Sequence, residues 1–169
     1  MKCLTSNEAL SLCADFLVEY TEDGKGTWLR LRGGDDNPHW GQFRPEHYKQ
    51  EFLARTIVEE IRSPLGYLVW FYDWNIFSRD KGLFEIVRRF RETYGETRSL
   101  SESPAFHCDP NEADLCKDLI RFAMAFDWGC YAISLDGKTL VEIHDEGAAF
   151  WGFDKEIRDE LITAVDWKS

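Results

Sequence analysis

Apolar residues recur at helical spacing in five stretches of the chain, and this pattern predicts five amphipathic helices. The first begins with Thr5-Ser6-Asn7-Glu8, which has the form of a capping box, and is predicted to run from about Ser6 to Tyr20. The others are predicted over Glu46 to Arg62, from a cap at Ser78 or Asp80 to Gly95, from an N-cap at Asp109 to Gly129, and from a cap at Asp154 to Val165.

Five shorter runs have the composition of strands, and they lie at residues 27–32, 67–72, 130–135, 138–143 and 148–151. The run from Tyr67 to Tyr72 is continuously apolar, which predicts a central strand covered on both faces. Asp136-Gly137 between two strand-like runs is a strong hairpin signal, and Glu146-Gly147 turns the chain once more. The C-terminal part is therefore predicted to contain a three-stranded antiparallel meander.

The order of these elements favours an α+β fold, because consecutive hairpin strands replace the regular alternation of a doubly wound sheet. We predict one globular α+β domain over residues 1–169. Its sheet should be mostly antiparallel with about five strands, including the meander, and about five helices should pack on it. Residues 33–45 lack periodicity and are predicted to form a long loop.

Acidic residues outnumber basic ones by 31 to 20, which gives a net charge of −11. The excess is uneven, since residues 1–100 carry a net charge of −2 and residues 101–169 carry −9. Such a surface repels phosphate backbones and anionic lipid, so we expect neither a nucleic acid nor a membrane as partner. A basic protein is the partner that this field would attract, although acidic surfaces also serve simply to keep proteins in solution.

The chain is also rich in aromatic residues, with 7 Trp, 6 Tyr and 12 Phe. In this acidic, aromatic-rich composition it resembles small bacterial antitoxin and immunity proteins. The resemblance lies in composition and covers no motif. It implies a non-catalytic protein that binds another protein.

The sequence lacks the common motifs of catalysis and cofactor binding: the phosphate-binding glycine loops, the nucleophile elbow and His-Glu-x-x-His. We therefore predict no cofactor, and a binding protein rather than an enzyme. Glu8 and Asp15 interrupt any N-terminal signal core, and the charge-free stretch from Ser63 to Tyr72 is too short to span a bilayer. The five cysteines have neither disulfide-framework nor zinc-ribbon spacing, so we expect a soluble cytoplasmic protein with reduced thiols.

Three short clusters could carry chemistry. His144-Asp145-Glu146 could bind a metal or act as a base, although these residue types also form ordinary turns. Asp35 and Asp36 with His39 offer ligands for a metal ion, without the spacing of a calcium loop. Cys108, just before a predicted helix, is a candidate reactive thiol because helix N-termini lower thiol pKa values.

Aromatic and acidic residues outside the predicted core are candidate anchors for a partner. Trp40, Trp74 and Trp151 are candidates for exposed tryptophans, and Asp73 follows the central strand. The local basic cluster of Arg88, Arg89 and Arg91 is predicted to form a solvated helix face, because Glu85 and Glu92 lie at helical-neighbour spacing and can pair with it.

Three hypotheses follow from these patterns. The first is a non-catalytic protein that binds a basic partner, of the immunity, antitoxin or regulatory kind. The second is a small metal-assisted hydrolase that uses His144 and Asp145 or the loop from Asp35 to His39. The third is a structural homo-oligomer that buries a sheet edge or an aromatic patch, so the expected state is a monomer or a small homo-oligomer.

Overall fold

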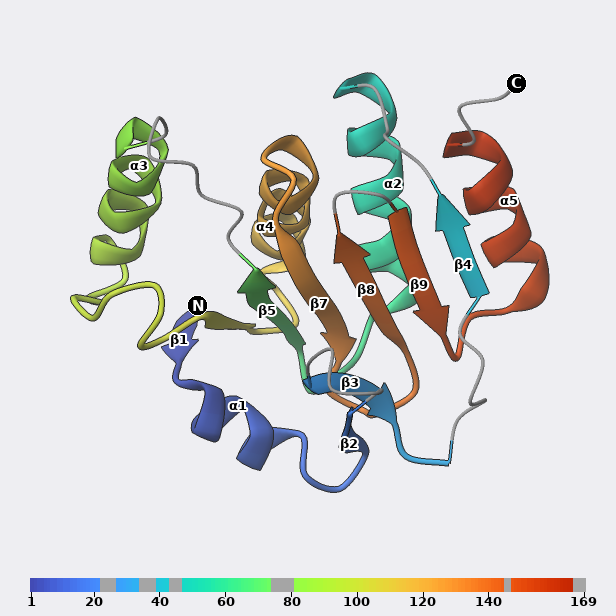
Figure 1. The fold of residues 1–169 in the computed structure, drawn as a ribbon, viewed down its shortest axis with the longest axis horizontal. Helices are drawn as coiled ribbons and strands as arrows, with labels where there is room; N and C mark the ends of the chain where they lie inside the picture. Colours follow the sequence, from blue (N-terminus) through green and yellow to red (C-terminus); the bar gives the residue numbers. More distant parts are fainter. Residues whose placement is uncertain (22–26, 34–38, 43–46, 74–80, 145–146, 166–169) are drawn as a thin grey trace.

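The computed structural model describes residues 1–21, 27–33, 39–42, 47–73, 81–144 and 147–165 (Figure 1). These residues form five helices, namely α1 (Ser6–Leu12), α2 (His47–Glu60), α3 (Lys81–Glu92), α4 (Ala113–Ala125) and α5 (Lys155–Val165). One sheet has the spatial order β1 (Lys2–Leu4), β6 (Ala105–Cys108), β5 (Tyr67–Asp73), β7 (Gly129–Ser134), β8 (Leu140–His144), β9 (Gly147–Trp151) and β4 (His39–Gln42). β2 (Leu17–Thr21) and β3 (Thr27–Leu31) form a separate hairpin.

All neighbouring strands of the main sheet pair antiparallel. The predicted α+β class, the antiparallel sheet, the number of helices and the meander β7-β8-β9 are therefore confirmed. The main sheet has seven strands in the described part of the chain, where about five were predicted.

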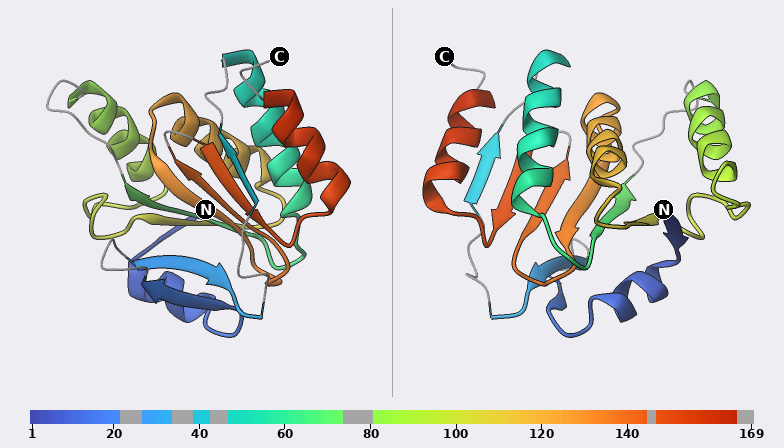
Figure 2. Two further views of the ribbon diagram at one scale, coloured as in Figure 1. Left: turned by 45° about the vertical axis from the view of Figure 1, so that its right-hand side comes forward. Right: turned by 180° about the vertical axis from the view of Figure 1, so that it is seen from behind.

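The main sheet lies between two layers (Figure 2). Helices α2, α4 and α5 cover one face, while α1 and the β2-β3 hairpin cover the other. Helix α3 stands at one side of the molecule, away from the other helices of its layer (Figures 1 and 2).

Strand β5 shows why both layers are needed. Its residues alternate between the two faces, so Val69 and Phe71 pack under the helices, whereas Leu68 and Trp70 pack under α1 and the hairpin. All of these side chains are buried. The continuous apolar run therefore marks a central strand covered on both faces, as predicted.

The first predicted helix is too long. The capping box at Thr5 and Glu8 is present, but α1 ends at Leu12 and the chain continues as β2. Residues 17–21 pair along their whole length with β3, and the buried Leu17 joins the core on that side of the sheet. The apolar spacing fitted a helix, but the β-branched and aromatic residues of this stretch fit a strand equally well, and pairing decides between them.

The predicted N-cap at Asp109 is also wrong. Helix α4 begins at Ala113, and its N-cap is Glu112, whose side chain makes no capping hydrogen bond. The Glu112 carboxylate instead accepts hydrogen bonds from the Met1 ammonium group and from the Asp109 backbone N–H. This pairing fixes the start of β1 to the turn before α4. Glu112, which fitted a capping pattern in the sequence, therefore makes a tertiary contact instead.

Loss of the capping box gives a first testable prediction. In Thr5→Ala the hydroxyl that accepts the Glu8 N–H, at 3.2 Å, is absent, and the free energy of unfolding should fall by about 1 kcal/mol. Denaturant unfolding followed by circular dichroism measures the change. Ser11→Ala, on the same helix and without a capping role, should change stability much less, and an equal loss in the two variants would contradict the assignment.

Candidate functional site

A site rich in aromatic side chains lies beside the second half of β5. Strand β6 pairs with β5 only from Tyr67 to Trp70, and the Phe71 N–H then bonds to the carbonyl of Pro104. Beyond this point the chain before β6 leaves the sheet, and a cavity of about 350 Å³ opens on the face covered by α1 and the hairpin. Its lining includes the side chains of Glu19, Leu29, Trp70, Tyr72 and Tyr131, together with Ser6 and Ser101.

Aromatic rings from two neighbouring strands form one wall of this aromatic pocket. Tyr72 of β5 and Tyr131 of β7 have ring centroids 4.8 Å apart at an interplanar angle of 35°. Trp28 of β3 meets Tyr72 edge to face, with centroids 6.1 Å apart. The hairpin thus holds the Tyr72 ring in place, although 36% of the Tyr72 surface remains exposed.

A buried carboxyl group lies behind these rings. Glu142 of β8 is 1% exposed, and the Tyr72 hydroxyl donates a 2.8 Å hydrogen bond to its Oε1. Tyr131 also hydrogen-bonds to Glu142, and the Tyr131 hydroxyl accepts the backbone N–H of Leu29 at 3.3 Å. The network therefore runs across one face of the sheet, from the hairpin over β5 and β7 to a carboxyl group on β8.

Burial dominates the electrostatics of this network. It raises the pKa of Glu142 above its ordinary value of 4.5, against the opposing effects of the Tyr72 hydrogen bond, the His144 charge and the Tyr131 hydrogen bond. Burial also raises the pKa of Tyr72, and the neighbouring Glu142 raises it further. Tyr72 therefore stays protonated and acts as a donor to the carboxyl group.

Such a site suits a cation. The faces of tyrosine and tryptophan rings attract ammonium and guanidinium groups, and carboxylates at the rim or behind the rings add to the attraction. Glu19 is exposed at the rim, and Glu142 stands behind Tyr72. Apolar rings with a few polar groups are also the usual composition of a ligand pocket.

Of the predicted cluster His144-Asp145-Glu146, the structure places His144 near Glu142. His144 is the last residue of β8 and is half-buried, two positions after Glu142 and so on the same side of the strand. Its charge lowers the pKa of Glu142. Asp145 and Glu146 lie outside the described residues, so a joint site of the three stays a prediction.

The predicted metal loop is not described as a unit. Asp35 and Asp36 lie outside the described residues, while His39 belongs to β4, opposite Phe150. Within the described part of the chain, no group of three or more His, Cys, Asp or Glu side chains could hold a metal ion.

The predicted anchors are placed unequally. Trp151 is buried in the core beneath α1 and the hairpin, at 4% exposure, and Asp73 is exposed at the end of β5, next to Tyr72. Trp40 belongs to β4, opposite Ala149, but its side chain is not among those described, and Trp74 lies outside the described residues.

The prediction of a reactive Cys108 is wrong. Its side chain is fully buried on β6, and burial raises the pKa of the thiol to about 12. The helix that was expected to lower this pKa begins only at Ala113. A nucleophilic thiol needs the opposite shift and access to solvent.

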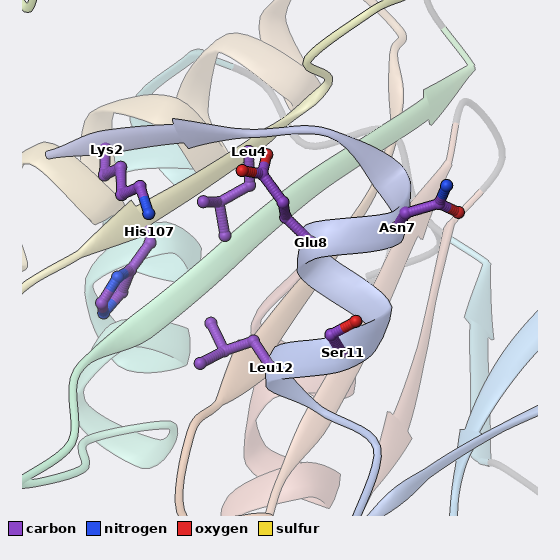
Figure 3. A pocket seen from close by; sticks show the side chains of 7 residues that line it. All are labelled: Lys2, Leu4, Asn7, Glu8, Ser11, Leu12 and His107. Atoms are coloured by element: carbon purple, nitrogen blue, oxygen red, sulfur yellow. The ribbon is translucent and has the colours of Figure 1, made fainter.

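A second, more open hollow lies between α1 and the β1–β6 edge (Figure 3). Lys2 and His107 point into it from the two strands, and Leu12 and Glu8 face it from α1. The Glu8 carboxylate already accepts the Thr5 N–H, which lowers its pKa. With its acid used in the helix cap, this hollow is less suited to ligand binding than the aromatic pocket.

Glu142, Tyr131 and Tyr72 were not singled out from the sequence. One signal was present, because Glu142 interrupts an otherwise apolar stretch at the position where alternation with Leu140 places a core residue. When a strand is covered on both faces, a charged residue at such a core position is buried and needs hydrogen-bond partners. The identity of those partners depends on the order of the strands, which the local pattern does not contain.

The fold and the pocket together define a three-layer α+β protein with an aromatic pocket backed by a buried carboxyl group. No protein-family model, curated protein or solved structure matches the chain. Among the helices of the described residues, none has the length and apolar character needed to cross a lipid bilayer.

Proposed function

We propose that this protein is a non-catalytic binding protein and that its aromatic pocket receives a basic side chain of a protein partner. The observation that carries the proposal is the buried Glu142 held by Tyr72 and Tyr131, with the ring of Tyr72 partly open to the pocket. A guanidinium or ammonium group in the pocket would lie against the rings and near two carboxyl groups.

The overall charge supports the same partner. With a net charge of −11, concentrated in residues 101–169, the protein attracts cationic proteins over a distance of about 10 Å at moderate salt. This field increases the rate of encounter with any cation, and the pocket is what would select one side chain. The partner is therefore expected to present an exposed arginine or lysine on a basic surface.

A short arginine peptide tests the proposal, with binding followed by amide chemical shifts and by tryptophan fluorescence, to which Trp28 and Trp70 at the pocket contribute. We expect the arginine peptide to bind at low salt and a glutamate peptide of the same length not to bind. Tyr72→Ala and Glu19→Gln should each weaken binding about tenfold, because each removes one part of the cation site.

Two variants separate the pocket from general attraction by the acidic surface. Tyr94→Ala removes an exposed tyrosine from the turn after α3, and Glu156→Gln removes an exposed carboxylate from α5. Both should leave affinity unchanged within about twofold. If Glu156→Gln weakens binding as much as Glu19→Gln, the peptide binds by net charge alone and the proposal is wrong.

A further inference from the structure

Another cavity, of about 670 Å³, lies between α3 and the chain that leads to β6. Its lining differs from that of the aromatic pocket, since it combines basic groups with hydroxyls: Arg88, Arg91, Arg98, Thr97, Ser99 and Ser101. Phe84 and Leu100 add apolar surface. We call it the arginine cavity, and its volume is in the range of small-molecule sites.

Arg91 is the unusual member of this lining. Its sequence position predicted a solvated helix face, but the side chain is only 2% exposed. Its Nη2 donates to the carbonyls of Ser99 and Ser103, at 3.4 and 3.1 Å, and to the Ser103 hydroxyl, and its guanidinium carbon lies 5.8 Å from the Phe106 ring centroid. Its Nε is buried and has no hydrogen-bond partner among the described residues.

The other two arginines of the cavity are already neutralised. Arg88 pairs with Glu85 and Glu92 on α3, as the sequence predicted, and Arg98 pairs with Glu96. Within the described residues, Arg91 hydrogen-bonds to carbonyl and hydroxyl oxygens and to the Cys3 thiol, and Glu96 is near enough for Arg91 to lower its pKa. A buried guanidinium without a directly bound carboxylate is costly and is stabilised by an anion.

The two carboxylates that line the cavity do not meet this need. Glu85 is bound by Arg88 and Arg89, and Glu102 accepts hydrogen bonds from the backbone N–H and hydroxyl of Ser99. Each of these carboxylates is bound by its own partners, and neither accepts a hydrogen bond from Arg91 in the described structure.

We propose that the arginine cavity binds a small organic anion through its phosphate or carboxylate group. Arg91 supplies the buried positive charge, the hydroxyls of Thr97 and Ser101 supply neutral donors, and Phe84 with Leu100 contacts the organic part. The site is separate in chemistry from the aromatic pocket, although Ser101 lies on the boundary of both.

Titration calorimetry with phenyl phosphate, benzoate and phenol tests this proposal. Phenyl phosphate or benzoate should bind with a Kd of about 1 mM or tighter, and phenol should not bind, because it lacks the anionic group. Tighter binding of the phosphate identifies a phosphate ligand, and tighter binding of benzoate identifies a carboxylate ligand. Absence of binding by both anions at about 20 mM, or equal binding of phenol, overturns the proposal.

Substitutions locate the site. Ser101→Glu places a carboxylate at the cavity wall, where Ser101 is exposed and bonds only to the Ser99 hydroxyl among the described residues, and should weaken anion binding at least about tenfold. Ser11→Glu, on exposed surface of α1, is the matched control and should leave binding unchanged. Arg91→Gln should abolish binding, but Arg91 also holds residues 99–103 in place, so this variant could act through a loss of structure. Ser101→Glu is therefore the deciding variant. An equal effect of Ser11→Glu and Ser101→Glu contradicts the site.

Discussion

Replacing Gly152 with alanine is expected to lower the free energy of unfolding by about 3 kcal/mol, one of the largest effects of a single methyl group in this protein. Gly152 follows β9 and has a φ of +74°, a backbone conformation that alanine adopts at a cost of about 1–2 kcal/mol. A Cβ at this position would overlap the carbonyl oxygen of Lys138. Lys138 leads into β8, whose Leu140 pairs with Trp151, so the overlap cannot be relieved without disturbing the meander.

Gly95→Ala is the matched control for this prediction. Gly95 has a similar φ of +79°, but a Cβ there would have no other heavy atom within 4 Å. This variant should lose only about 1 kcal/mol, from backbone strain alone. Urea unfolding of the two variants beside the wild type measures the difference, and equal losses would show that the contact with Lys138 contributes nothing.

The elements that the sequence predicted well are those in which local pattern and tertiary environment agree. The apolar run of β5 requires cover on both faces, and the turn at Asp136-Gly137 sets the pairing of β7 with β8. These features need no knowledge of distant residues. They were enough to predict the α+β class and the C-terminal meander.

The elements that were missed depend on distant partners. Strands β1, β6 and β4 have three or four residues each, too few to show a period, and each exists because a longer neighbour offers its edge. β2 was assigned to a helix because its pairing with β3 is invisible in the local spacing. Short strands at the ends of the sheet or next to an end are therefore the part of this fold that local patterns cannot specify.

The candidate sites follow the same rule. The aromatic pocket draws on α1, β2, β3, β5, β7 and β8, so its parts are separated by up to 136 positions, between Ser6 and Glu142. Net charge and aromatic content led to the expectation of a basic partner, which stays a prediction. The sequence could not indicate which rings and which carboxyl group meet, because strand order determines that.

Replacing Glu142 with alanine is expected to lower the free energy of unfolding by about 3 kcal/mol near pH 4.5. Because folding raises the pKa of this carboxyl group above 4.5, more than half of it is protonated in the folded protein at that pH. Alanine leaves a cavity and removes the partner of the Tyr72 and Tyr131 hydroxyls, and a buried donor without a partner costs about 1–3 kcal/mol. Glu142→Gln is the control, since it keeps the volume and a hydrogen-bonding oxygen.

The pH dependence of these variants tests the network itself. A carboxyl group whose pKa is raised by folding contributes stability below its unfolded pKa, and this contribution is lost as the pH rises through the folded pKa. The wild type should therefore lose stability relative to Glu142→Gln between pH 4.5 and neutral pH, and the deficit of Glu142→Ala should shrink over the same interval. Unfolding free energies measured across this range would show parallel curves for all three proteins if Glu142 were solvated, which would remove the basis for the buried carboxyl group behind the aromatic pocket.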